Sequence, residues 1–330
     1  MATINEVAQE ANVSISTVSR VINNSFVVTE EKRRSVLAAM KKVGYQPAQR
    51  TRNSTSSSNK IILVISSLLI QDLFIEIQNV ANDMGYNVLF NYIGDSNTGY
   101  ANSFDLLQLL NDKVCGIILV NTIFKIKEIH TYFERFPVIQ VGEAYQSNPC
   151  YIVSTDDIHA AYDLTNLLIR KGKNRIAFMT IERPEESKME FSDNRLKGYK
   201  QALIEHNLPI CEDLIAYTDF SIEGGIEGTK KLLQLPKRPD AIFCLSDSMA
   251  VGCIKALKSE GINIPNEISV AGFDNLVIAS VCSPELTTVA QSFTEIGAEA
   301  VRMLDMLING VMTQGRRIFI NYEIIEREST

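Results

Sequence analysis

The stretch 3–24, TINEVAQEANVSISTVSRVINN, carries side chains suited to reading DNA bases. Its first half repeats apolar residues at helical spacing, and Thr3 followed by Glu6 forms a capping box. The pattern breaks at 12–14 and predicts a second helix whose outward face is small, hydroxyl-bearing or basic: Ile15, Ser16, Thr17, Ser19 and Arg20. A helix with such a face can enter the major groove and contact base edges. An ordinary helical hairpin has the same spacing, so the remaining sequence must separate the two interpretations.

Charge is distributed unevenly along the chain. The net charge of the 330 residues is −7, yet residues 1–58 hold eight Lys or Arg against four acids, so they carry +4 and the remainder −11. A basic head on an acidic body fits a polyanionic partner for the head alone. A chance fluctuation would give the same excess, and the charge pattern is therefore only supporting evidence.

Several classes of protein are disfavoured by what the sequence lacks. The opening MATINEVAQE has no charged-then-apolar leader, and no apolar run approaches the ~18 residues of a membrane span. The six cysteines form no C-x-x-C pair, and His130, His159 and His206 have no metal-ligand spacing. We therefore expect a cytoplasmic protein without a membrane anchor, a metal site or a cofactor.

The first 60 residues divide into a helical head at 1–46 and a linker at 47–60. A third helix is expected after Thr29, with an apolar stripe of Val36, Leu37, Met40 and Val43. The linker is rich in Ser, Thr and Asn and has too few apolar side chains to pack. It carries Arg50 and Arg52, which are candidates to lie against DNA phosphates, although a plain tether is the alternative.

From residue 61 onward, apolar runs alternate with helical patterns. The expected strands are IILVIS (61–66), VLFNY (88–92), GIILV (116–120), VIQV (138–141), IAFMT (176–180), LIAYT (214–218), AIFCL (241–245), ISVAGF (268–273) and IFINYEII (318–325). Helices are expected between them, at 71–84, 102–112, 126–133, 160–171, 195–206, 222–234, 248–259 and 293–308. This alternation predicts an α/β core of two doubly wound parallel-sheet subdomains. Ligands bind beyond the carboxyl ends of such strands, which places a cleft between the two halves.

Over its full length the chain resembles LacI-type transcription regulators, the lactose and purine repressor family. The similar segments are MATINEVAQEANVSISTVSRVIN, GYQP (44–47), DAIFCLSDSMAVG (240–252), IPNEISVAGFDN (264–275), PELTTVAQ (284–291) and the closing IIERES. Within the family, QPAQRTRN, DLFIEI (72–77) and the C-terminal tail look most like the cytidine-repressor branch. The resemblance implies a helix-turn-helix head and a periplasmic-binding-protein-like core at 61–330. The implied N-subdomain spans about 61–158 plus 292–316, and the C-subdomain about 159–291 plus 317–330.

The resemblance also implies a homodimer whose two heads bind a two-fold operator in double-stranded DNA. By motif position, Ile15, Ser16 and Arg20 would contact bases, with Arg20 suited to guanine. The implied phosphate contacts are Ser14, Thr17, Asn23 and Thr29. Dimer contacts would come from the helix at 71–84 and from 248–257, where Met249, Val251 and Ile254 belong either to the interface or to the core.

The linker departs from the family pattern. Many relatives have an Ala-Arg-x-Leu run whose leucine wedges into the minor groove, whereas this chain has Thr51-Arg52-Asn53-Ser54. The Ser54 side chain cannot act as an apolar wedge. We therefore expect little operator kinking, tolerance of variable half-site spacing, and some reliance on a second DNA-bound regulator.

The resemblance places an effector site in the cleft. Phe74 and Phe220 match aromatic pocket positions, Arg195 matches an arginine that grips hydroxyls or a carboxylate, and Asp274 matches an acid that accepts from a sugar ring. Core packing is the alternative for the two phenylalanines. Asp247 follows strand AIFCL and is a further candidate, with capping of the helix at 248 as its alternative.

The other expected wall residues bear on the kind of effector. Met189 and Phe191 fall where purine-binding relatives have polar or charged side chains, so they disfavour a charged effector. Asp156 is a further candidate acceptor, and its neighbour Asp157 leaves that assignment open. A ribose held by an arginine and an acid, with a base between aromatic rings, fits a nucleoside such as cytidine. A neutral hexose is the competing effector.

The sequence disfavours two other functional classes, an enzyme and a solute-binding protein. A sugar- or nucleoside-processing enzyme would need an assembled nucleophile and base or a phosphate-binding loop, and the sequence offers neither. A solute-binding protein would share the two-lobed core, but it would need an export signal and no basic head. The expectation is therefore a non-enzymatic, effector-controlled repressor.

Overall fold

The computed structural model describes residues 4–14, 17–18, 21, 30–43, 60–93, 113–121, 135–142, 151–181, 190–312 and 314–330. The chain separates into two compact units, Met1–Ser58 and Asn59–Thr330. We call them the head and the core. The helices expected at 102–112 and 126–133 lie outside the described residues.

The head contains helices α1 (Ile4–Glu10) and α3 (Glu30–Val43), and Thr17, Val18 and Val21 are also helical. Ser14 caps the turn that leads into Thr17, because its Oγ accepts from the Thr17 backbone N–H at 3.2 Å. The second helix expected after the break at 12–14 is thus confirmed at these residues.

A small apolar cluster holds the head together, and its buried members are Val7, Ala8, Ala11, Val18, Val21, Val36 and Ala39. The stripe predicted for α3 was wrong at Leu37, which is 52% exposed, whereas Ala39 is buried. Lys42 and Glu10 join the ends of α3 and α1 through a 2.6 Å surface ion pair. Such exposed pairs add little stability, so this head depends mainly on its few alanines and valines.

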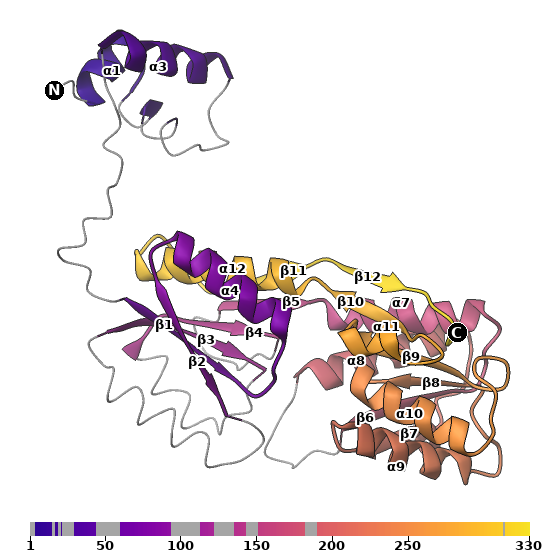
Figure 1. Ribbon diagram of the computed structural model, residues 1–330. Coiled ribbons are helices and arrows are strands. Elements are labelled where there is room, and N and C mark those ends of the chain that lie inside the picture. The colour runs from indigo at the N-terminus through magenta and orange to yellow at the C-terminus, as the bar shows by residue number, and fades with distance from the viewer. Residues whose placement is uncertain are drawn as a thin grey trace. The chain divides into compact units, whose positions relative to one another are not determined.

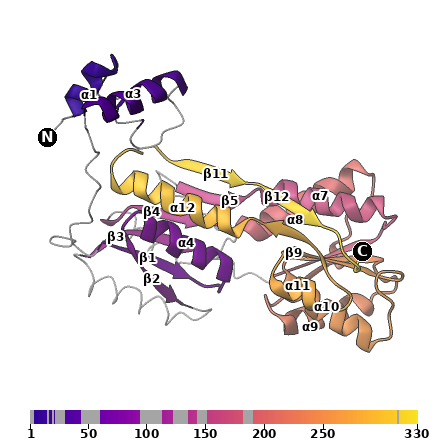
Figure 2. The same cartoon turned by 45° about the horizontal axis from the view of Figure 1, so that its top comes forward.

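The first lobe of the core is built on a sheet with strand order β11-β5-β4-β3-β1-β2. Its strands are β1 (Ile61–Ser66), β2 (Asn87–Tyr92), β3 (Val114–Val120), β4 (Val138–Val141), β5 (Tyr151–Thr155) and β11 (Arg316–Ile320). All their pairings are parallel. Helices α4 (Gln71–Asp83) and α12 (Phe293–Ile308) lie side by side on one face of this sheet (Figures 1 and 2).

The second lobe has strand order β12-β10-β9-β8-β6-β7. Its strands are β6 (Ile176–Ile181), β7 (Ile215–Thr218), β8 (Ala241–Cys244), β9 (Ser269–Asp274), β10 (Thr287–Gln291) and β12 (Tyr322–Ile325). Only β12 runs antiparallel to its neighbour among these pairs. One face is covered by α7 (Asp157–Arg170) and α8 (Glu190–Glu205), the other by α9 (Ile222–Leu233) and α10 (Asp247–Ser259) (Figure 1).

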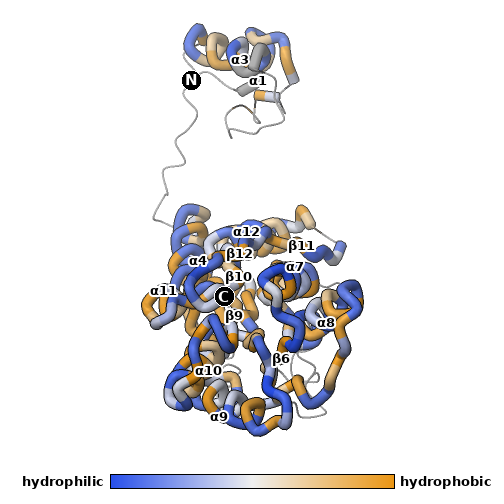
Figure 3. The backbone as a smooth tube through the Cα atoms, turned by 90° about the vertical axis from the view of Figure 1, so that its right-hand side faces the viewer, coloured by the Kyte–Doolittle hydropathy of each residue, from blue (hydrophilic) through white to orange (hydrophobic). Residues whose placement is uncertain are grey.

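Continuous apolar runs form the central strands of the second lobe because helices cover both faces of its sheet. Strands β6 and β8 are buried at every residue, as parallel strands between helix layers must be. The helices are two-sided instead, and Figure 3 shows hydrophilic and hydrophobic segments mixed along them. In the second lobe, Phe178, Phe243 and Tyr199 stack or meet edge to face in the centre of the core.

The chain crosses between the lobes three times, from β5 to α7, from β10 to α12 and from β11 to β12. Two sequence predictions were wrong at the third crossing. IFINYEII was expected as one strand, but β11 pairs with β5 and β12 pairs with β10, so the chain changes sheets at Asn321. The expected subdomain boundary near 316 therefore shifts, since Arg316–Ile320 belongs to the first lobe. The segment is mostly apolar and is interrupted only by Asn321 and Glu323, so the sequence gives little sign of such a crossing.

The other expected core strands and the described helices are confirmed, with small shifts at their ends. Strands β5 and β10 were not predicted. Helix α8 begins at Glu190 and not at Arg195, because Glu190 and Asp193 suit the positive end of the helix dipole. The helix α11 (Val277–Val281) follows β9 and was not predicted either.

Helices α9 and α10 approach so closely that two positions require glycine. A Cβ on Gly225 would lie 2.1 Å from the Met249 carbonyl oxygen, and one on Gly252 would lie 2.0 Å from the Ile222 carbonyl oxygen. Both obstacles are backbone atoms, which cannot move aside as a side-chain end can. This contact fixes α10, whose first turn reaches the cavity described below.

We expect Gly252→Ala to lower the free energy of unfolding by about 1–3 kcal/mol, because the added methyl group forces the two helix backbones apart. Denaturant titration monitored by circular dichroism measures the change. Lys255→Ala, at an exposed position of the same helix, is the control and should change stability by less than about 0.5 kcal/mol. Equal effects of the two substitutions would contradict the close-packing explanation.

Candidate effector-binding site

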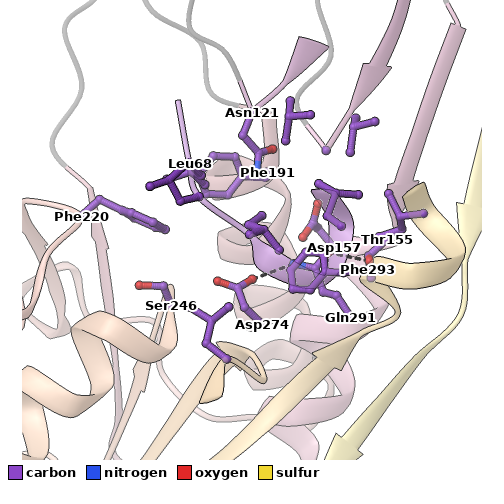
Figure 4. A pocket seen from close by; sticks show the side chains of 18 of the residues that line it. Leu68, Asn121, Thr155, Asp157, Phe191, Phe220, Ser246, Asp274, Gln291 and Phe293 are labelled. Atoms are coloured by element: carbon purple, nitrogen blue, oxygen red, sulfur yellow. Dashed lines mark hydrogen bonds between the residues drawn. The ribbon is translucent and has the colours of Figure 1, made fainter. Parts of the chain in front are cut away.

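A cavity of about 210 Å³ lies where the carboxyl ends of the strands of both lobes meet. The first lobe contributes Leu68 and Asn121, and the second lobe contributes Phe220 and Asp274. Figure 4 shows Phe220 on one side of the cavity and Asp157, Thr155 and Gln291 on the other. The cavity therefore has Phe220 on one side and most of its polar groups on the other, where Phe293 also lies (Figure 4).

Arg195 is the central charged group of the polar side, and its residue is only 4% exposed. Its Nε donates to Asp157 Oδ1 at 2.8 Å, and its Nη1 donates to the Leu245 carbonyl oxygen at 2.6 Å. Its Nη2 lies 3.7 Å from Asp274 Oδ1. A buried charge is tolerated only when paired and hydrogen-bonded, and Arg195 meets that condition with two carboxylates and a carbonyl.

Aromatic rings complete the surroundings of this guanidinium. Its carbon lies 3.5 Å from the centroid of the Phe273 ring and 5.1 Å from that of Phe191. A cation over an aromatic face is attracted by the ring quadrupole. Hydrogen bonds at its edge and the Phe273 ring against its face therefore fix the Arg195 guanidinium without a ligand. The Arg195 side chain then loses little conformational freedom when a ligand binds.

Asp274 projects from the end of β9 into the cavity with its side chain 15% exposed. Gln291 Nε2 donates to Asp274 Oδ1 at 2.7 Å, and Thr155 Oγ1 donates to Gln291 Oε1 at 2.7 Å (Figure 4). Burial raises the pKa of Asp274 to about 6, although Arg195 and the Gln291 hydrogen bond oppose the rise. Thr155 and Gln291 end the two strands that lead into the first two crossings, so this relay links both crossings to the carboxylate.

Asp247 lies behind the cavity wall and is fully buried. It accepts from the Leu276 backbone N–H at 2.7 Å and from Thr288 Oγ1 at 2.6 Å. Burial, reinforced by the negative charge of Asp274, raises the pKa of Asp247 to about 8. The alternative role of capping α10 belongs instead to Ser246, whose Oγ accepts from the Met249 N–H.

Of the three phenylalanines predicted to line the cleft, two line the cavity and Phe74 does not. Phe191 and Phe220 both line the cavity and meet edge to face, with ring centroids 6.1 Å apart. Phe74 was misplaced: it packs against Phe90 at 5.0 Å and against the apolar core of the first lobe, and its neighbour Leu73 lines the cavity instead. Adjacent helical residues point about 100° apart, so a motif position alone does not decide which one faces a ligand.

Of the two adjacent acids Asp156 and Asp157, only the second lines the cavity. Asp157 lines the cavity and pairs with Arg195, whereas Asp156 caps α7 by accepting from the His159 N–H at 3.1 Å. Asp156 lines a smaller neighbouring cavity of about 130 Å³. Burial raises the pKa of Asp157, and the charge of Arg195 opposes the rise. Met189 lies outside the described residues, so its placement stays a prediction.

Several cavity residues were missed by sequence reasoning, namely Leu68, Asn121, Thr155, Ser246, Gln291 and Phe293. Thr155 and Gln291 end the two strands that were not predicted. Asn121 directly follows β3, and Ser246 comes two residues after the end of β8, so the rule that ligands bind at strand carboxyl ends could have found them.

Two of the predicted DNA contacts fall in the described part of the head. Ser14 is exposed, and its Oγ is shared between the Thr17 N–H and Thr17 Oγ1, the latter at 2.8 Å. This local bonding shows a capping role for Ser14. The other predicted contacts lie outside the described residues: Ile15, Ser16, Arg20, Asn23, Thr29, Arg50 and Arg52.

The described ranges contain neither a cluster suited to a metal ion nor a membrane-spanning helix. No group of three or more His, Cys, Asp or Glu is placed there to hold a metal ion. No helix in those same ranges is both long enough and apolar enough to cross a bilayer.

Two family profiles match the chain. The profile described as bacterial regulatory proteins, lacI family, matches residues 3–48, and a periplasmic binding protein-like domain matches 165–330. Catabolite control protein A of Priestia megaterium is 32% identical over 338 residues, covering 99% of each chain. The HTH-type transcriptional repressor CytR of Escherichia coli (strain K12) is 33% identical over 335 residues, covering 100% of this chain and 96% of the relative.

Solved structures agree with the fold. A complex of the transcriptional regulator CelR with cellobiose superposes with a TM-score of 0.73 at 26% identity, covering 100% of both chains. The Lac repressor bound to ONPG superposes with a TM-score of 0.70 at 25% identity, covering 100% of this chain and 99% of the other. The expected α/β class, with two parallel-sheet subdomains and an N-terminal helix-turn-helix head, is therefore confirmed.

The carboxyls of Asp247 and Asp274 should make stability fall as pH rises. Asp247 and Asp274 have folded-state pKa values of about 8 and about 6, above the ordinary value of 3.8. Between pH 4 and 8 the unfolded chain therefore loses protons that the folded chain keeps, and the free energy of unfolding decreases across this window. Asp247→Asn removes one of these groups and should flatten the decrease in denaturant titrations from pH 5 to 8.

The control for this pH experiment is Asp213→Asn, at an exposed position, which should leave the slope of the wild type unchanged. Parallel stability profiles for Asp247→Asn and the wild type would show that Asp247 does not contribute to the pH dependence.

Removing the charge of Arg195 should strongly lower the free energy of unfolding. Arg195→Gln leaves Asp157 buried without its partner, and we expect a loss of about 3–5 kcal/mol in the free energy of unfolding. Arg302→Gln breaks the exposed pair with Glu299, whose charged atoms lie 3.6 Å apart, and should cost less than about 1 kcal/mol. Equal denaturation midpoints for the two variants would refute the pairing role given to Arg195.

Proposed function

The chain belongs to the LacI family of bacterial regulatory proteins, as a DNA-binding transcriptional regulator with an effector-binding core, and we propose that its effector is a nucleoside such as cytidine. Effector binding would then set the affinity of the N-terminal head for operator DNA, with repression as the output. The observation that carries this proposal is that the Arg195–Asp274 pair and the rings of Phe191 and Phe220 line the same small cavity.

The polar side of the cavity suits a ribose. Vicinal hydroxyls both donate and accept hydrogen bonds, so they need an anionic acceptor and a cationic donor next to each other. Asp274 and Arg195 provide these within 3.7 Å, and Gln291 adds an amide that already touches Asp274. Displacing that amide contact by a ribose hydroxyl would transmit occupancy to Thr155.

The other side suits a planar, uncharged base. Phe220 and Phe191 provide aromatic surface, and Leu68 and Leu73 make the adjoining wall apolar. A pyrimidine can stack on an aromatic ring, and an apolar wall gives no compensation for a buried charge. The sequence predicted a base between Phe74 and Phe220. We propose stacking against Phe220 instead, because Phe74 packs against Phe90 and the apolar cluster inside the first lobe.

A sugar is the second candidate. The CelR structure, whose fold this core shares, holds cellobiose. The catabolite control and cytidine repressor relatives are almost equally similar to this chain, at 32% and 33% identity. A cavity of about 210 Å³ is small for ligand sites, which typically measure about 300–1,000 Å³, and this favours a compact ligand. The aromatic side favours the nucleoside over a hexose.

We propose a homodimer because a two-fold operator requires two heads. Exposed apolar side chains on both lobes suit a subunit interface, namely Leu69 at 70%, Ile75 at 49%, Val277 at 77% and Val281 at 71% exposure. Of the residues first considered for this role, Met249 and Ile254 are buried in the core, at 0% and 3% exposure. Helix α11 and the start of α4 are therefore the better candidates, and a cytoplasmic location follows from operator binding.

The base-contact assignment also stays part of the proposal. Ile15, Ser16 and Arg20 would contact bases, while Thr17, Asn23, Thr29, Arg50 and Arg52 would hold phosphates. A linker without the family leucine would bend the operator weakly. A second DNA-bound regulator beside the operator would compensate for the weaker grip.

Thermal-shift screening of the full chain tests the effector class. Cytidine at 100 times its dissociation constant should raise the melting temperature by about 5 °C, because ligand binding stabilises only the folded state. Phe220→Ala should abolish the shift, whereas Tyr217→Ala, at an exposed strand position, should retain it. A shift with glucose and none with cytidine would reject the nucleoside in favour of the sugar.

Operators with altered centres test the linker. Without an apolar wedge, one or two base pairs inserted between half-sites should reduce affinity less than about tenfold, as measured by footprinting on operators selected from random duplexes. Ser54→Leu restores the family leucine and should bind the original spacing more tightly while losing the tolerance. Complete loss of wild-type binding on insertion would contradict an elastic linker.

A further inference from the structure

The turn that follows β9 has an unfavourable backbone conformation. Asp274 has a φ of 108° and Asn275 a φ of 53°, both in the left-handed region where a side chain is disfavoured. Such a turn persists only when neighbouring groups hold it. Because the first of these residues supplies the cavity carboxylate, whatever holds the turn also aims that carboxylate.

Two groups hold the backbone of the turn from inside the lobe. Asp247 Oδ2 accepts from the Leu276 N–H at 2.7 Å, and Thr288 Oγ1 accepts from the Asn275 N–H at 3.4 Å. The same Thr288 hydroxyl donates to Asp247 Oδ1 at 2.6 Å, which ties the two holding groups together. The adjacent strand has glycine at 272, where a Cβ would lie 2.4 Å from Asp247 Oδ1. The space for this carboxylate is thus built into β9.

A third group comes from the end of the chain. Arg327 Nη2 donates to the Asn275 side-chain Oδ1 at 2.8 Å, and its Nη1 donates to the Leu286 carbonyl oxygen at 2.7 Å. The Arg327 side chain is 14% exposed and does not line the cavity. Arg327 thus hydrogen-bonds to the side chain of the turn, at Asn275, while Asp247 hydrogen-bonds to its backbone, at Leu276.

The C-terminal tail is itself fastened to the two strands that flank the turn. The Arg327 N–H donates to Thr287 Oγ1 at 2.8 Å. The fully buried Ser329 donates from its Oγ to the Val270 carbonyl oxygen at 2.6 Å and accepts from the Thr287 N–H at 2.8 Å. Strands β9 and β10 therefore fix the place from which the guanidinium reaches Asn275.

We propose that Arg327 is a positioning residue for effector binding, which holds Asn275 in its left-handed conformation and thereby keeps the Asp274 carboxylate directed into the cavity. This inference rests on the proposed function, because it deepens the role given to the same site. Arg327 touches no ligand, and its influence passes through the turn. Loss of its hydrogen bond lets the turn relax and moves Asp274 Oδ1 away from Gln291 and Arg195.

Substitutions at Asn275 separate conformational positioning from general stability. Asn275→Ala removes the acceptor for Arg327 and keeps a Cβ, so the left-handed turn becomes unfavourable and unheld. Asn275→Gly also removes the acceptor, but glycine adopts this conformation readily and needs no holding group. Positioning predicts that only the alanine variant binds weakly, whereas a simple requirement for the Arg327–Asn275 contact predicts that both do.

Calorimetric titration of the full chain with cytidine provides the affinity test. Arg327→Gln and Asn275→Ala should each weaken binding about tenfold, and the double variant should be no weaker than either single one, since both remove one contact. Asn275→Gly, alone or with Arg327→Gln, should stay within about threefold of the wild type. Glu285→Gln, which removes only the 3.8 Å ion pair to Arg327, is the control and should bind normally.

Hydrogen exchange without ligand gives an independent readout. Peptides covering 274–281 should exchange faster in Arg327→Gln and Asn275→Ala, while peptides of β6 and β8 keep wild-type rates. If cytidine fails to bind the wild type, the nucleoside proposal fails and this exchange pattern alone decides the role of Arg327. If Arg327→Gln does not fold, the alanine–glycine pair at 275 decides it. Unchanged exchange at 274–281, or equal weakening by Asn275→Gly and Asn275→Ala, would overturn the proposal.

Discussion

The buried guanidinium of Arg195 is the constraint around which the core is arranged. A cation that is 4% exposed requires compensating oxygens, and the chain supplies them from Asp157, Leu245 and Asp274. Asp157 follows β5, Leu245 directly follows β8 and Asp274 ends β9, so satisfying one charge brings the first crossing and two strand ends together. The cleft has a fixed polar side because the charge cannot be left unpaired.

This arrangement places the proposed effector site next to the connections between the lobes. Asp274 is linked through Gln291 to Thr155, and those last two residues end the strands that cross between lobes. A ligand that competes for the Asp274 carboxylate therefore perturbs contacts at two crossings at once. Regulation needs such a differential contact, because a ligand shifts an equilibrium only as far as it binds the two states unequally.

The fold could be predicted further than the site, for physical reasons visible in particular residues. Strands such as β6 are buried on both faces and appear as continuous apolar runs, whereas β10 begins with Thr287 and Thr288, which are buried but polar. Arg195, Phe220 and Asp274 follow from motif positions. The choices between Phe74 and Leu73 and between Asp156 and Asp157 depend on which way a helical turn faces, and one position of sequence changes that direction by about 100°.

The central claim, that occupancy of the core cleft controls operator binding, is tested most directly by measuring both affinities reciprocally. Fluorescence anisotropy gives the operator dissociation constant with and without saturating cytidine, and calorimetry gives the cytidine constant with and without operator. Both ratios should differ from one by the same factor, of about 5 or more, because coupling between two sites is reciprocal. Cytidine binding that leaves the operator affinity unchanged would contradict it.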